Sequence, residues 1–75
     1  MEHYKNLSGD SGVVAYAVRR GAIVVQFVNK SAYLYTDASA GADHIAEMQR
    51  LAKAGRGLST YISQVVRDDY AEQLR

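Results

Sequence analysis

The sequence contains neither cysteine nor proline, and each absence excludes a kind of structure. Without cysteine, the 75-residue chain can form no disulfide and no thiolate metal site. A chain of this length buries only about 60% of the surface that its unfolded form exposes, so a small core or a partner subunit must stabilise it. Without proline, no helix or strand is interrupted by a residue that lacks a backbone N–H group.

An excess of charge of one sign is also missing. Nine basic residues face eight acidic ones, and the net charge of +1 is far from the strong basic excess of many nucleic-acid-binding proteins. No apolar run approaches the roughly 20 residues of a membrane span, and the first residues do not have the pattern of a signal peptide. Because 48% of the residues are apolar, we expect a single folded domain. The absence of cysteine fits the reducing cytoplasm, where we expect the chain to lie without membrane association.

Three segments rich in β-branched and aromatic residues predict strands at 13–18, 22–28 and 31–36. The short connections between them predict an antiparallel meander. In the second connection, a two-residue loop at Asn29 and Lys30 would need positive φ at both positions, so we expect a turn that is strained or longer. Residues 1–10 are polar and are predicted to form a tail or loop.

Helical periodicity replaces the strand pattern within residues 43–75. Ile45, Met48 and Leu51 fall on one stripe and predict a helix over residues 44–54, which Gly55 ends. The preceding residues, 37–43, are predicted to form a loop.

A second helix is predicted after the glycine-containing turn, with Ser59 as its N-cap. Its apolar stripe runs from Leu58 through Tyr70 to Leu74. The expected fold is therefore α+β: a three-stranded antiparallel β-meander followed by two α-helices packed on one sheet face, in the order β-β-β-α-α.

The alternation of the strands assigns side chains to two sheet faces. The face expected under the helices holds Val14, Tyr16, Val18, Ile23, Val25, Phe27, Tyr33 and Tyr35. The opposite face carries no charge, and its candidate interaction residues are Ala15, Ala17, Val24, Gln26 and Leu34. Such a face indicates either a protein–protein contact, most simply with a second copy of the chain, or a tolerable surface of small side chains.

A basic, glycine-rich turn is the candidate site for an anion or a nucleic acid. Arg50, Lys53 and Arg56 surround it, and Gly57 and Ser59 stand where a helix begins, a position that offers free backbone N–H groups. The alternative is a helix–helix turn that needs glycine for its geometry and carries solvated charges. Tyr33 and Tyr35 could stack on bases if they are exposed, or could belong to the core.

The residues give little evidence for a metal site or for catalysis. Asp43, His44 and Glu47 have helical spacing, but a zinc site would need further ligands. No pair of carboxylates and no nucleophile with its base converge. We therefore expect no catalytic residue, no metal, no cofactor and no small-molecule substrate.

The spacing of Phe27, Asn29, Ser31, Tyr33 and Tyr35 resembles the KTSC domain, whose hallmark is a central Tyr-x-Tyr. The segment from Gly55 to Ile62 is similar to the second half of that family, and the resemblance covers roughly residues 11–70. The chain departs from the family at the hairpin turn, where Lys30 replaces the usual glycine.

The KTSC domain occurs at the C-terminus of some lysyl-tRNA synthetases and alone in short bacterial proteins. The resemblance therefore implies a small non-enzymatic binding module, with RNA as its suggested ligand. The alternative is a protein-interaction or homodimerisation module that uses the uncharged sheet face.

Overall fold

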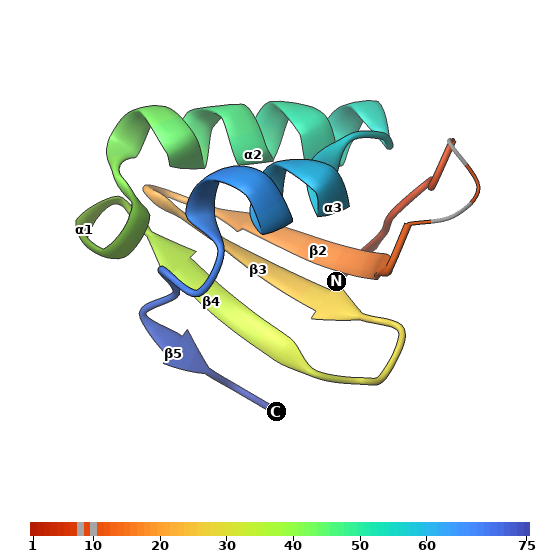
Figure 1. Ribbon diagram of the computed structural model, residues 1–75, viewed down its shortest axis with the longest axis horizontal. Coiled ribbons are helices and arrows are strands. Elements are labelled where there is room, and N and C mark those ends of the chain that lie inside the picture. The colour runs from red at the N-terminus through yellow and green to blue at the C-terminus, as the bar shows by residue number, and fades with distance from the viewer. Residues whose placement is uncertain (8, 10) are drawn as a thin grey trace.

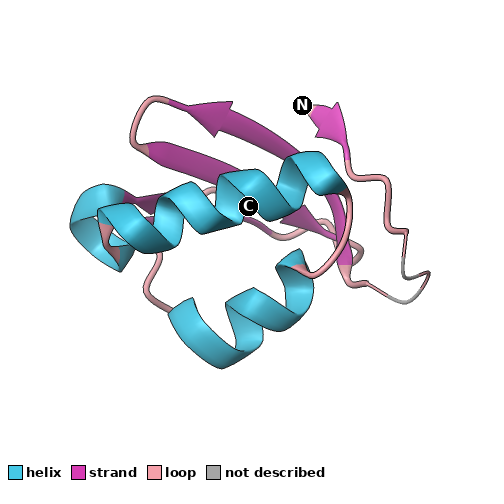
Figure 2. Cartoon of the chain, turned by 90° about the horizontal axis from the view of Figure 1, so that it is seen from above, coloured by secondary structure: helices cyan, strands magenta, loops and turns pink. Residues whose placement is uncertain are grey.

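The computed structural model describes residues 1–7, 9 and 11–75. A five-stranded antiparallel sheet, in the order β1-β2-β3-β4-β5, carries the helices on one face (Figures 1 and 2). The strands are β1 (Glu2–His3), β2 (Val13–Arg19), β3 (Ala22–Phe27), β4 (Ala32–Thr36) and β5 (Glu72–Gln73). The helices are α1 (Asp37–Ala40), α2 (Ala42–Ala54) and α3 (Leu58–Tyr61), which continues as the π-helical turn η1 (Ile62–Val66). The α+β class is confirmed, with two more strands than predicted.

The central meander forms where the sequence predicts it. Tyr16 lies opposite Val25, which lies opposite Tyr33, so these three side chains share the face under the helices. A β-bulge between Val13 and Ala15 interrupts the alternation at the start of β2. Val13 is therefore 1% exposed in the core and Val14 is 37% exposed, so the expectation that Val14 faces the helices is wrong.

The N-terminal segment belongs to the fold. Glu2 and His3 pair with β2, and the next residue, Tyr4, is 1% exposed in the core. The Tyr4 hydroxyl accepts a hydrogen bond of 3.3 Å from the backbone N–H of Leu58. The prediction of a tail is therefore wrong for residues 2–4, because one buried aromatic anchors an otherwise polar segment. That prediction also covered residues 8 and 10, which lie outside the described residues.

The short helix α1 and the first two residues of α2 replace the loop that was predicted over residues 37–43. Thr36 caps α1: its hydroxyl accepts from the Ser39 N–H, and the Ser39 hydroxyl accepts from the Thr36 N–H. Helix α2 then begins after Gly41, without a side-chain cap. Its Gln49 amide donates to the carbonyls of Arg19 and Ala22, at 3.0 and 2.9 Å, and so ties α2 to the β2–β3 turn.

The second long helix is shorter than predicted. Gly57, and not Ser59, is the N-cap residue of α3, and η1 ends at Val66. Arg67 reverses the chain with a φ of 48°, after which β5 pairs with β4. Tyr70 and Leu74 therefore lie off the helix.

The core lies between the sheet and one side of the helices. Its most buried side chains are Tyr4, Val13, Ile23, Val25, Tyr35, Ile45, Met48, Leu58 and Val66. Among the described residues, no helix has the length and apolar character needed to cross a membrane.

Candidate nucleic-acid interface

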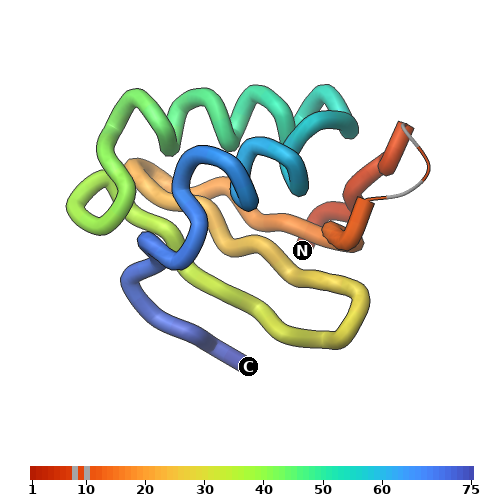
Figure 3. The backbone as a smooth tube through the Cα atoms, in the orientation of Figure 1, coloured from red at the N-terminus to blue at the C-terminus, as the bar shows by residue number. Residues whose placement is uncertain are grey.

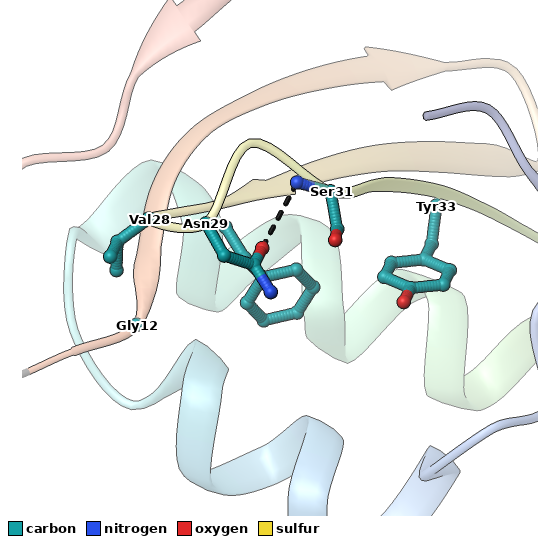
Figure 4. A pocket seen from close by; sticks show the side chains of 6 residues that line it. Gly12, Val28, Asn29, Ser31 and Tyr33 are labelled. Carbon is teal, nitrogen blue, oxygen red and sulfur yellow. Dashed lines mark hydrogen bonds between the residues drawn. The ribbon is translucent and has the colours of Figure 1, made fainter.

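A shallow groove of about 430 Å³ lies beside the β3–β4 hairpin (Figure 4). It is lined by Gly12, Phe27, Val28, Asn29, Ser31 and Tyr33. Four of these six are the alternating hairpin positions that also carry the KTSC resemblance. The sequence motif therefore describes one side of a groove, and its spacing is the signal by which the groove could have been found.

The hairpin turn has three residues, because Lys30 N donates to Phe27 O at 2.9 Å and Phe27 N donates to Ser31 O at 2.8 Å. Lys30 holds the left-handed position with a φ of 71°. The Asn29 side-chain oxygen accepts from Ser31 N at 3.0 Å and closes the turn (Figure 4). The sequence predicts a turn that is strained or longer than two residues, and the structure has a longer turn with Lys30 at positive φ.

The two motif tyrosines have different environments. Tyr35 is 2% exposed, and its hydroxyl donates to the Arg67 carbonyl at 3.3 Å. Burial, with a smaller contribution from Tyr33, raises the pKa of Tyr35 to about 12. Tyr33 is half-buried and reaches the groove, with ring centroids 5.8 Å from Phe27 and 4.6 Å from Tyr70. Tyr35 therefore belongs to the core, and Tyr33 offers aromatic surface to a ligand.

Three polar groups on this side of the hairpin are available to a ligand. Within the described part of the chain, the Asn29 amide nitrogen and the hydroxyls of Ser31 and Tyr33 have no hydrogen-bond partner. Figure 4 shows the three side chains on the same side of the hairpin. The groove thus combines aromatic surface with hydrogen-bonding groups of both kinds.

Three segments that each carry a basic residue lie toward the end of the molecule that holds the groove. The β3–β4 hairpin with Lys30, the α2–α3 turn with Arg56 and the N-terminal segment with Lys5 lie at the same end (Figure 3). Lys5 packs closely on the α2–α3 turn: a Cβ atom built on Gly55 would lie only 2.6 Å from the Cβ atom of Lys5. Lys5 was not predicted as a candidate residue, because residues 1–10 were predicted to form a tail or loop.

Gly12 connects the start of α3 with the groove. A Cβ atom at Gly12 would lie 3.8 Å from a ring carbon of Phe27 and 4.0 Å from the hydroxyl of Ser59. Ser59 is therefore a neighbour of the groove, and Arg56 and Gly57 precede it in the α2–α3 turn. The start of α3 itself is partly occupied, because the Leu58 N–H already binds the Tyr4 hydroxyl.

The other two predicted cations lie elsewhere. Arg50 forms two hydrogen bonds, of 2.9 and 2.6 Å, with the carboxylate of Glu47, and these lower the pKa of that carboxyl. Lys53 lines a depression beside β1 and β2 that also contains Glu2. The structure therefore separates both from the groove, and their role in nucleic-acid binding stays a prediction.

The sheet face opposite the helices, here called the open face, carries the predicted interaction residues. One row across it contains Ala15, Gln26 and Ala32, and the next contains Ala17, Val24 and Leu34. The edge strands extend these rows with His3 and Glu72, so the face is uncharged only in its centre. The expectation of an uncharged face is wrong at its two edges, because β1 and β5 were not predicted.

Comparisons of the chain with protein-family models, curated proteins and solved structures find no match. The resemblance to the KTSC domain therefore stays a prediction. Among residues 1–7, 9 and 11–75, no three His, Asp or Glu side chains are placed to hold a metal ion.

Proposed function

We propose that the chain is a small non-enzymatic module that binds single-stranded nucleic acid, with RNA as its ligand. The observation that carries the proposal is the groove lined by Phe27 and Tyr33, which opens at the end of the molecule that holds Lys30 and Arg56. Modules that bind single strands combine aromatic surface for bases with cations for the backbone. The KTSC resemblance supports the same ligand.

In the proposed complex, a base enters the groove and stacks against Tyr33. The Asn29 amide and the Ser31 hydroxyl then meet the polar edge of that base, since neither group has a partner among the described residues. Lys30 and Arg56 contact phosphates on either side of it. An unpaired strand is required, because the bases of a duplex stack on one another and present only their edges.

A fluorescence-anisotropy titration with short single-stranded RNA tests the proposal. We expect saturable binding at low salt that weakens as salt is added, with a logarithmic slope of about −0.7 per phosphate contact. Replacing Arg56 with Gln should weaken binding and reduce the slope by about one contact. Arg20→Gln is the matched control, because Arg20 lies in the β2–β3 turn at the other end of β3.

A second pair of variants isolates the contribution of stacking. Tyr33→Leu keeps an apolar side chain in place but removes the aromatic face, and we expect it to weaken binding roughly tenfold or more. Tyr16→Leu makes the same change on the same sheet face, outside the groove, and should bind as the unmodified chain does. The absence of saturable binding at low salt, or equal losses in both variants, would overturn the proposal.

A further inference from the structure

The open face has no helix against it, yet its composition is that of a contact surface. Its centre consists of the half-buried Ala15, Val24, Gln26 and Leu34 together with Ala17 and Ala32, which are buried within the chain at 7% and 1% exposed. Two large apolar residues stand at its opposite edges: Met1, before β1, is 67% exposed and Leu74, after β5, is 44% exposed. An apolar sheet face of this kind usually marks an interaction site.

We propose that the open face binds the open face of a second copy of this chain, about a two-fold axis that runs parallel to the strands through β3. Such an axis places β2 of one copy over β4 of the other, and each edge strand over the opposite edge strand. Leu34, on β4, then lies over the small Ala17 on β2 of the second copy, and the same contact occurs twice. A large side chain thus meets a small one at these two contacts, as close packing of two sheets favours, whereas Ala15 lies over the small Ala32 of the second copy.

The residues on the axis are also self-complementary. Val24 lies in the central row of β3 and meets its own copy. Gln26, the polar residue at the centre of the face, has no side-chain hydrogen bond within the described part of the chain. On the axis its amide can both donate to and accept from the same amide of the second copy.

The charges at the edges select this axis over the perpendicular one. Glu72 lies in the row of Leu34 at the β5 edge, whereas His3 and Arg19 lie in the adjacent rows on β1 and β2. An axis parallel to the strands places Glu72 over β1 of the second copy. It is then displaced along the strands by one row, roughly 7 Å, from His3, and by one row and one strand from Arg19, with about 10 Å between the two sheets. A perpendicular axis would place the two Glu72 carboxylates together, and like charges repel.

The area of the open face limits the expected affinity of the dimer. Five strands at about 4.8 Å spacing and three rows at roughly 7 Å make a face of about 500 Å² for each copy. The total of about 1,000 Å² stands at the lower limit for specific interfaces, so we expect dissociation constants in the micromolar range. This face is opposite the helices, and pairing leaves the groove accessible.

Sedimentation equilibrium over micromolar to millimolar concentrations tests the pairing. We expect a reversible monomer–dimer equilibrium in the unmodified chain. Leu34→Glu should abolish it, whereas Val65→Glu, on the helix side and 40% exposed, should leave it unchanged. Circular dichroism verifies that each variant is folded. A monomer throughout the range in the unmodified chain would overturn the proposal.

Two further experiments test the axis without disturbing the core. Glu72 and Arg19 are exposed, so Glu72→Arg should weaken the dimer and Glu72→Arg combined with Arg19→Glu should restore it. Because the chain lacks cysteine, a single Val24→Cys substitution gives one reactive thiol on the axis. A short bis-maleimide should link Val24→Cys chains into dimers and fail to link Val65→Cys chains. Failure of both the charge exchange and the Val24→Cys link would overturn this geometry.

Discussion

Lys30 combines a positive charge with a strained backbone conformation beside the candidate groove. Its φ of 71° is a conformation in which glycine has no steric penalty, whereas a side chain costs roughly 1–2 kcal/mol. The strained residue stands at the rim of the candidate groove, between Asn29 and Ser31. Backbone strain of this kind is concentrated at functional sites, and a lysine here supplies a cation at the end of the molecule where a phosphate would bind.

Replacing Lys30 with Gly should therefore separate folding from binding. We expect the free energy of unfolding in urea to rise by about 1 kcal/mol, because the turn is relieved of strain. RNA affinity should fall, because a cation is lost. Lys30→Ala is the matched control, since it loses the same charge but keeps the side-chain strain. If both variants bind RNA as the unmodified chain does, Lys30 makes no phosphate contact.

Tyr35 gives the fold a dependence on high pH. Its pKa is raised from 10.0 to about 12, chiefly by burial. The unfolded chain loses this proton as the pH passes 10, whereas the folded chain keeps it up to about 12. Stability should therefore be unaffected below pH 10 and fall between pH 10 and 12, by on the order of 2 kcal/mol.

Urea unfolding at several pH values measures this loss. Tyr35→Phe removes the titrating group and also the hydrogen bond to Arg67, so it should be less stable at pH 7. Between pH 10 and 12 its stability should fall less steeply than that of the unmodified chain. Equal slopes would show that Tyr35 is not the group responsible.

The N-terminal segment, with β1 and Tyr4, is the part of the fold that differs most from the sequence prediction. It contributes Tyr4 to the core, where the hydroxyl occupies the N–H of Leu58 at the start of α3. We expect Tyr4→Ala to destabilise the chain by about 3–5 kcal/mol, because it leaves a cavity in a small core. Tyr4→Phe should cost about 1–3 kcal/mol, because it leaves a buried donor unpaired.

Chemical denaturation of the two Tyr4 variants, with His3→Ala as the exposed control from the same segment, measures these effects. The control should lie within about 0.5 kcal/mol of the unmodified chain. If Tyr4→Ala were as stable as the control, the segment would be the tail that its polar sequence suggests.

Elements long enough to show a repeating hydrophobic pattern could be predicted, and the shorter elements could not. The central strands and α2 extend over enough residues for the alternation, or the helical stripe, to be read. Strands β1 and β5 have two residues each, too few for any period. The end of η1 was missed because Arg67 makes the turn without a glycine or proline to mark it.

The residues of the groove could be named from the sequence as positions of the family resemblance, but the binding site was predicted at the basic α2–α3 turn and not at a groove. Phe27, Asn29, Ser31 and Tyr33 stand out by their spacing, yet only the three-residue turn and the position of Gly12 make them line one groove. The basic cluster at the α2–α3 turn could not be ordered from the sequence. Which cations surround this turn depends on the pairing of Arg50 with Glu47 and on the fold of the segment that carries Lys5.

In the whole molecule, the groove proposed to bind RNA and the open face proposed to form a dimer are separate surfaces. The groove and the cations lie at one end, beside the β3–β4 hairpin and the α2–α3 turn, whereas the open face lies on the side of the sheet away from the helices (Figure 1). A dimer formed through the open face would therefore carry two accessible grooves. Linking two weak sites in this way raises the apparent affinity for one strand that reaches both.

An NMR titration of the ¹⁵N-labelled chain with a short single-stranded RNA at low salt tests binding in the groove most directly. We expect amide shifts that change progressively and cluster at Gly12, the hairpin residues 27–33 and the turn residues 55–59. We also expect added salt to reverse those changes. Shifts confined to the open face, or no shifts at saturating RNA, would show that the groove does not bind RNA.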